Sequence, residues 1–171
     1  MTDGAEDGDV TQAQAMRLGA VRPAYLQTLA LVERLHRRLL DVVKDEFARR
    51  GDHEVSAVQA LLIYNVKDAE LTAGELRERG YYLGVNVSHN MKKLVETGYV
   101  HRIRAGEGKR AVRFGLTEKG RAVHVVVAEL YEKHMVVIER IGGVSGEELS
   151  ALNQSLIRLE RFWIDQIRFR L

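Results

Sequence analysis

Apolar residues recur at helical spacing over long stretches at both ends of the chain, and they alternate with polar residues only in one short central region. The first helical pattern follows Pro23, a residue favoured at a helix start, and continues to about Arg50, where Gly51 ends it. Its apolar residues spread beyond one narrow stripe, which predicts more than one neighbouring element. The preceding residues 1–21 are small, polar and acidic, and we expect a flexible tail there.

Two shorter helices follow. Asp52 is a plausible N-cap for a helix over 54–67. Thr72 and Glu75 have the spacing of a capping box, which predicts a third helix that ends near Gly80.

The pattern then changes from helical to alternating. A turn at 81–84 precedes a fourth helix to Thr97, with Gly98 as its stop. Residues 99–104 and 111–116 are strand-like, and the glycine-containing turn between them predicts a β-hairpin.

Two helices complete the chain. Thr117 is a candidate N-cap for a fifth helix to about Arg140, and two glycines follow it at 142–143. Ser145 and Glu148 form a second capping box that opens a last helix, whose apolar stripe is Leu149, Leu152, Leu156, Leu159 and Trp163. The expected fold is mainly α with a small β-hairpin.

Composition excludes several classes of protein. The absence of cysteine excludes disulfides, thiolate zinc sites and thiol redox switches. No apolar run approaches the roughly 18 residues of a membrane span, and the acidic start is unlike a signal peptide, so we expect a cytoplasmic protein with no membrane partner.

Charge is concentrated in one segment of this near-neutral chain, whose net charge is +2. The segment from Gly98 to Arg121 contains only two acidic residues but seven basic ones: Arg102, Arg104, Lys109, Arg110, Arg113, Lys119 and Arg121. Such a block favours an anionic partner, although a solvated hairpin would have the same composition.

The fourth helix combines an apolar stripe with a polar face. Val87, Met91, Leu94 and Val95 would face the core, while the other side carries Asn86, Ser88, His89, Asn90, Lys92 and Lys93. Asparagine can bond an adenine edge, and lysine or histidine can contact guanine or phosphate. A short helix, a turn, this helix and a basic hairpin are the parts of a winged helix-turn-helix, which would place the fourth helix in the major groove of double-stranded DNA. The alternative is a merely solvated polar face.

The hairpin is the expected wing. We expect Val112, Phe114 and Leu116 to share one face and Arg102, Arg104 and Arg113 to point outward, with Lys109 and Arg110 at a tip that can reach the minor groove. The alternative is protection of an edge strand by charge.

Three segments resemble the MarR family of bacterial regulators: residues 94–100 (LVETGYV), 110–113 (RAVR) and above all 116–121 (LTEKGR). The similarity in helix order extends over residues 22–171. It implies a homodimer in which 22–50 and 117–171 form the dimerisation part and 52–116 the DNA-binding part. It also implies a palindromic operator and often a small effector. Gly108 replaces an acid that is common in the family, and His89 stands where arginine is frequent.

Other functions have less support from the sequence. No string of residues indicates catalysis, and Gly106–Lys109 lacks the remaining residues of a phosphate loop, so no enzyme activity and no cofactor are expected. His124 and His134 are too far apart on one helix to indicate a metal site, although a metal-responsive regulator stays open as an alternative. A second alternative function is that of a winged helix that binds another protein or shapes DNA. Tyr64, Tyr81 and Tyr82 could line an effector cavity or simply pack.

Overall fold

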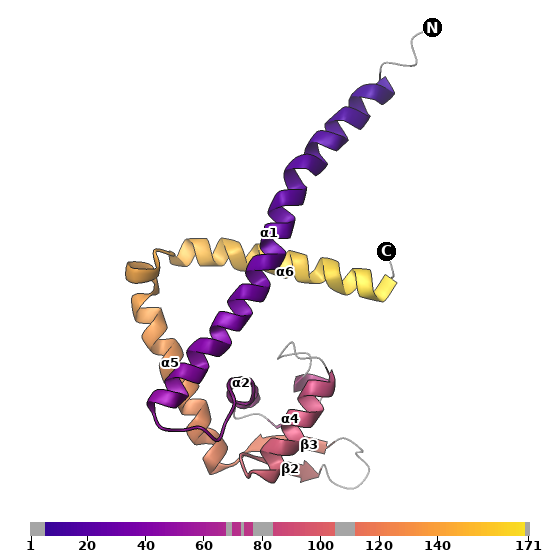
Figure 1. The fold of residues 1–171 in the computed structure, drawn as a ribbon. Helices are drawn as coiled ribbons and strands as arrows, with labels where there is room; N and C mark the ends of the chain where they lie inside the picture. Colours follow the sequence, from indigo (N-terminus) through magenta and orange to yellow (C-terminus); the bar gives the residue numbers. More distant parts are fainter. Residues whose placement is uncertain (1–5, 68–69, 73, 77–83, 105–111, 170–171) are drawn as a thin grey trace. The chain divides into compact units, whose positions relative to one another are not determined.

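The computed structural model describes residues 6–67, 70–72, 74–76, 84–104 and 112–169, which include several helices and one small sheet (Figure 1). The chain divides into two compact units, residues 1–60 and 61–171. No helix in the described ranges is long and apolar enough to cross a membrane.

The first unit contains the long helix α1, Glu6–Arg49. Pro23 lies inside α1, so the expectation that a helix starts at this proline is wrong. Residues 6–21, expected as a flexible tail, are helical. An internal proline costs about 3 kcal/mol, but alanine, glutamine, methionine and leucine on both sides are strong helix formers that offset this cost.

A Schellman motif ends α1 as expected at Gly51, whose φ of 74° is left-handed. The Asp52 N–H donates to the carbonyl of Phe47 and the Gly51 N–H to that of Ala48, both at 3.0 Å. These two bonds satisfy carbonyl groups that the helix end would otherwise leave unpaired.

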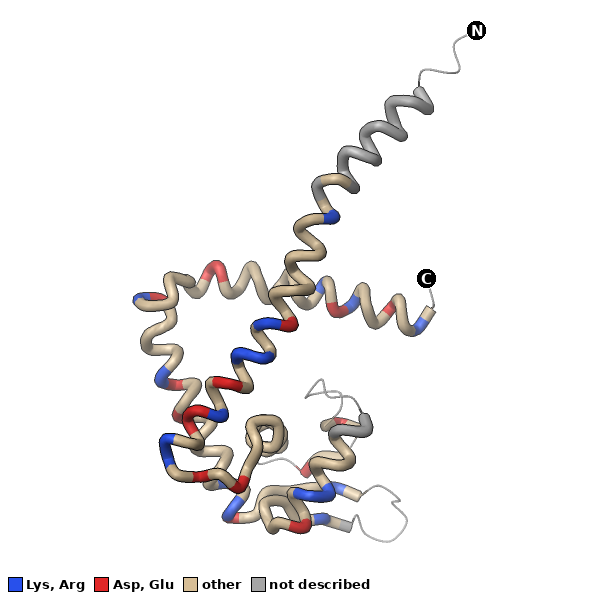
Figure 2. The backbone as a smooth tube through the Cα atoms, viewed as in Figure 1, with Lys and Arg blue, Asp and Glu red and all other residues tan. Residues whose placement is uncertain are grey.

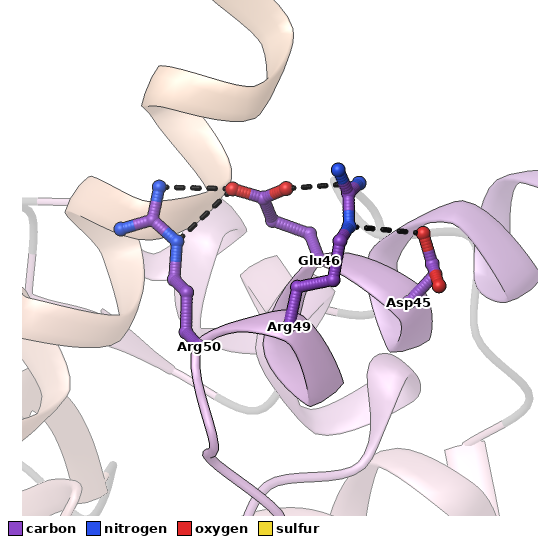
Figure 3. Close-up of polar contacts among 4 residues, drawn as sticks. All are labelled: Asp45, Glu46, Arg49 and Arg50. Carbon is purple, nitrogen blue, oxygen red and sulfur yellow. Dashed lines mark hydrogen bonds and ion pairs between the residues drawn. The ribbon is translucent and has the colours of Figure 1, made fainter.

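Glu46 organises the charges of this last turn (Figure 3). Its side chain is only 6% exposed, and its two carboxylate oxygens lie 2.9 Å from the Arg50 guanidinium and 3.1 Å from that of Arg49. Arg49 also contacts Asp45 at 3.1 Å. The positive charges of these arginines also interact favourably with the negative, C-terminal end of the helix dipole.

Helix α2, Ala57–Val66, begins later than expected. Asp52 is not its N-cap, because its carboxylate instead accepts the N–H of Glu54 in a local turn. The cap is Ser56, whose hydroxyl accepts the Gln59 N–H while the Gln59 side chain accepts the Ser56 N–H. Ser56 and Gln59 thus form a capping box that the sequence interpretation missed.

A strand that the sequence did not predict follows α2: β1, Leu71–Thr72. The capping box at Thr72 is confirmed, since the Glu75 N–H donates to the Thr72 hydroxyl and the Glu75 carboxylate accepts from Thr72. Residues 74–76 are helical. The rest of the expected third helix and most of the turn at 81–84 lie outside the described residues.

Helix α4, Gly84–Glu96, leads into the hairpin strands β2, Val100–Arg104, and β3, Val112–Leu116. The hairpin is confirmed, and β1 extends it to a three-stranded antiparallel sheet in the order β1-β3-β2. The fold is therefore mainly helical with a small sheet, as expected.

The last two helices are α5, Glu118–Gly142, and α6, Gly146–Phe169. Thr117 caps α5 by accepting the Gly120 N–H at 3.1 Å, and Gly143 ends this helix in the left-handed conformation. Ser145 and Glu148 form the expected capping box of α6. All three local predictions are confirmed.

The second unit has its core around the sheet. Its fully buried side chains include Leu62, Ile63, Val66, Leu76, Val87, Met91, Leu94, Val100 and Val127. In contrast, none of the described residues of α6 is buried, although the helix carries large apolar side chains.

Candidate DNA interface

Helix α4 has one buried face and one exposed face. Val87, Met91 and Leu94 are at most 1% exposed, as the apolar stripe predicted, and Val95 is half-buried. Of the expected DNA-contacting residues, four are exposed and Asn90 is half-buried; the exposed ones are Ser88, His89, Lys92 and Lys93. Asn86 lies in the first turn, but its side chain is outside the described part. The helix therefore presents hydrogen-bonding and cationic groups to solvent on a rigid apolar base.

The C-terminal end of α4 is fixed by a second Schellman motif. The Tyr99 N–H donates to the Leu94 carbonyl at 2.9 Å and the Gly98 N–H to that of Val95 at 3.2 Å, with Gly98 at a φ of 77°. The helix thus passes directly into β2.

The two faces of the hairpin differ from the expected arrangement. Arg102 lies opposite Phe114 and Arg104 opposite Val112, so these two arginines share the face of the apolar residues. Arg113 lies opposite Ile103 on the other face, so the three arginines, expected to point outward, do not share one face of the hairpin. The apolar face is buried only near its base, since Phe114 is 8% exposed and Val112 43%. Arg102, opposite Phe114, is nevertheless exposed.

Arg113 has a structural contact. Its guanidinium donates to the main-chain carbonyl of Glu70, just before β1. The side chain therefore ties β1 to β3, with its remaining N–H groups available for other partners.

Among the expected DNA-contacting residues, the described basic ones lie on α4 and on both strands of the hairpin, and Figure 2 shows basic positions on these elements. Lys92 has an exposed acidic neighbour, Glu96, at 3.8 Å. The expected tip residues Lys109 and Arg110 lie outside the described residues, and so does the side chain of Arg104.

The segment 116–121 packs onto the end of α4. The Thr117 hydroxyl donates to the carbonyls of Gly98 and Tyr99 at 2.7 and 3.0 Å, and the Thr117 N–H donates to that of Tyr99 at 3.1 Å. Lys119 places its ammonium 4.1 Å from the centre of the Tyr99 ring. The sequence interpretation used this segment as a family signature but did not identify its structural role, which is to join α5 to the end of α4.

An aromatic cluster lies between α2 and α5. The Tyr64 ring stacks on His124 and meets Tyr131 edge-on, each with ring centres 5.1 Å apart. Burial and the neighbouring Tyr64 raise the pKa of Tyr131 above 10.0. Tyr81 and Tyr82 lie outside the described residues. Within the described ranges, no three His, Asp or Glu side chains converge as metal ligands would.

Comparison with known proteins identifies this arrangement. Residues 55–120 match the winged helix DNA-binding domain family. The chain is 30% identical over 145 residues to the exopolysaccharide II synthesis transcriptional activator ExpG of Rhizobium meliloti (strain 1021), covering 85% of this chain and 74% of that protein. A crystal structure of a MarR family transcription regulator covers 89% of this chain and 98% of its own, with a TM-score of 0.67 and 19% identity.

The chain belongs to the MarR family of winged-helix transcription regulators. It is also similar to Streptococcus pneumoniae FabT, solved in complex with DNA, at 25% identity and a TM-score of 0.58, over 82% of this chain and 98% of that one. As a MarR-type regulator, the protein is a DNA-binding transcriptional regulator. In the winged-helix fold, α4 occupies the place of the second helix of the helix-turn-helix and β2–β3 that of the wing hairpin.

Proposed function

We propose that this regulator binds a palindromic operator as a homodimer, with α4 of each protomer in the major groove. The observation that carries the proposal is the exposed face of α4, where Ser88, His89, Lys92 and Lys93 are exposed opposite the buried Val87, Met91 and Leu94. A helix-turn-helix presents its second helix in this way, and FabT, a similar protein, was solved bound to DNA.

The roles within the interface follow from side-chain chemistry. Asn86 and His89, early in α4, are proposed to contact base edges. Ser88, Asn90, Lys92 and Lys93 complete the surface of the helix. The wing residues Arg102, Arg104, Lys109, Arg110 and Arg113 are proposed to contact phosphates or the minor groove. Arg113 would do so with the N–H groups left over from its bond to Glu70.

Exposed apolar side chains support the dimer. In α6, Leu152, Ile157, Phe162 and Ile164 are each 47–51% exposed, and α1 exposes Leu26 and Leu35 by 53% and 61%. Apolar helices of this length are typically covered in an obligate interface. We assign the interface to residues 22–50 and 117–171. A two-fold dimer would set the recognition helices about 34–36 Å apart and the half-sites about 10–10.5 base pairs apart.

A small, mostly apolar or aromatic effector is proposed to modulate DNA affinity. The cluster of Tyr64, His124 and Tyr131 supports this, because aromatic rings with polar ends suit such a ligand. An effector that favours one spacing of the recognition helices would change operator affinity by about 1–3 kcal/mol of coupling. A panel of aromatic compounds that changes neither the melting temperature nor operator affinity would refute this.

The operator is tested by selecting bound duplexes from a random DNA pool, followed by footprinting and sedimentation of the free protein. We expect a strong two-fold motif and a dimer at micromolar concentration. A motif with no symmetry, or a folded monomer, would contradict the proposal. Shallow sequence preference would favour a protein-binding or architectural winged helix, and metal in the purified protein would favour a metal-responsive regulator.

A further inference from the structure

A cavity of about 180 Å³ opens beside the wing sheet. His101, Ile103 and Gly115 contribute to it from the strands, Lys67 and Glu70 from the chain between α2 and β1, and Arg121 from the first turn of α5. His101 lies opposite Gly115, on the face of the hairpin that also holds Ile103. Val100 and Phe114 point to the other, buried face, from which Leu116 also contributes to the cavity lining.

The charged groups of the cavity are mostly cationic. Lys67 and Arg121 oppose one carboxylate, that of Glu70, and the His101 imidazole adds an N–H donor. Arg121 uses one nitrogen to donate to the Leu116 carbonyl at 3.0 Å, which fixes the guanidinium and leaves its other N–H groups. In the part of the chain that the structure describes, the side chains of Lys67 and His101 have neither a hydrogen bond nor an ion pair.

The backbone at Lys67 is a second, independent observation. Lys67 has a φ of 50°, and every other described residue with a positive φ is a glycine that ends a helix: Gly51, Gly98 and Gly143. Glycine takes this conformation without the steric cost that a side chain incurs. Helix α2 instead ends at a lysine whose side chain lines the cavity, and strain retained at such a position points to a functional role.

Gly115 makes room for the cavity wall. A Cβ at this position would lie 3.1 Å from the Cε1 and Nε2 atoms of His101 and 3.1 Å from Cδ1 of Ile103. A larger residue would therefore displace the imidazole that faces it across the strands.

We propose that this cavity binds a small anion that carries a phosphate or carboxylate group, held by Lys67, His101 and Arg121. Its size supports a small ion, because pockets for drug-sized ligands are roughly 300–1,000 Å³. Charge-assisted bonds from a lysine and an arginine suit an oxyanion, and the apolar Ile103 forms part of the cavity wall. The site does not depend on the proposed operator binding, and the anion would join α2, the wing and α5.

The test is a calorimetric titration of inorganic phosphate into the full-length protein without DNA, with succinate in a parallel titration. Saturable binding of at least one anion is expected. Lys67→Gly is expected to weaken it by about tenfold, the effect of losing one charge-assisted bond. Because glycine suits the backbone at this position, the melting temperature of Lys67→Gly should equal or exceed that of the wild type.

Two further variants sharpen the result. His101→Gln should also weaken anion binding, whereas His53→Gln, which removes an exposed histidine from the chain between α1 and α2, should not. Unchanged binding in Lys67→Gly, or no saturable binding of either anion, overturns the proposal. A third outcome is that neither free anion binds, but Lys67→Gly weakens the binding of random duplex DNA and lowers the slope of log affinity against log salt by about one. In that case the cations contact the DNA backbone instead, and the proposal is wrong.

Discussion

Gly120 lies against the main chain of Tyr99 so closely that a Cβ on this glycine would be 2.1 Å from the Tyr99 carbonyl oxygen. No side chain fits in that space. The first turn of α5 therefore packs directly against the backbone that links α4 to β2.

Gly120→Ala is expected to destabilise the fold by about 3 kcal/mol, because the methyl group must displace backbone rather than a flexible side chain. Urea unfolding measures the effect. Gly146→Ala is the control, since a Cβ there meets nothing within 4 Å. The control should be neutral or stabilising by up to about 1 kcal/mol. Equal stability of the two variants would contradict the packing described here.

Thr117→Ala is expected to cost about 1–2 kcal/mol. The change removes the acceptor for the Gly120 N–H and the donor to the carbonyls of Gly98 and Tyr99. Thr117→Ser keeps the hydroxyl and should remain within about 0.5 kcal/mol of the wild type. A serine variant as unstable as the alanine variant would mean that the methyl group, not the hydrogen bonds, stabilises the junction.

Glu46→Gln is expected to destabilise the first unit by about 1–2 kcal/mol. Its buried carboxylate lies within 3.1 Å of two guanidinium groups, and the neutral amide cannot satisfy both. Because Arg49 is exposed, the loss of stability should be smaller than for a fully buried ion pair. Asp45→Asn, the matched exposed control, should cost at most about 0.5 kcal/mol. Thermal unfolding of both variants tests the difference.

The start of α6 should weaken in acid. Hydrogen bonds from the Ser145 backbone N–H and side chain lower the pKa of Glu148 below its ordinary value of 4.5. A folded-state pKa below the unfolded one gives stability that is present above 4.5 and is lost as the pH falls through the folded value. NMR titration of the Glu148 carboxyl should show this lowered pKa, and Ser145→Ala should raise it part of the way. Titration at or above 4.5 in the wild type would contradict it.

Local chemistry explains which predictions from the sequence are confirmed. The capping boxes at Thr72 and Ser145, the cap at Thr117 and the stop at Gly98 each depend on residues within one turn, so the sequence alone shows them.

The errors arise where distant residues or competing local signals decide. Strand β1 has two residues and exists only because it pairs with β3, far along the chain. The relative faces of Arg102 and Arg113 depend on the register of the hairpin, which neither strand encodes alone. The anion cavity brings Lys67 and Arg121 together through the fold, and no spacing in the sequence predicts that. Asp52 and Ser56 are both favourable cap residues, and only the structure shows that Ser56 is the one used.

The proposed function depends on the exposed face of α4, and substitution of His89 tests this most directly. The measurement is the affinity for the selected operator and for random duplex DNA over a salt series. The variants are Asn86→Ala, His89→Ala and Arg102→Ala beside the wild type. His53→Ala is the control, because His53 is exposed and lies outside the proposed DNA contacts and dimer interface. Each substitution in α4 should reduce the binding free energy for the operator by about 1–3 kcal/mol, and that for random DNA by much less. Arg102→Ala should weaken the binding of both DNAs and lower the salt slope by about one per protomer. The control should change neither the affinities nor the salt slope. Equal losses on both DNAs for the α4 variants, with an unchanged slope for Arg102→Ala, would contradict DNA reading by this helix and wing.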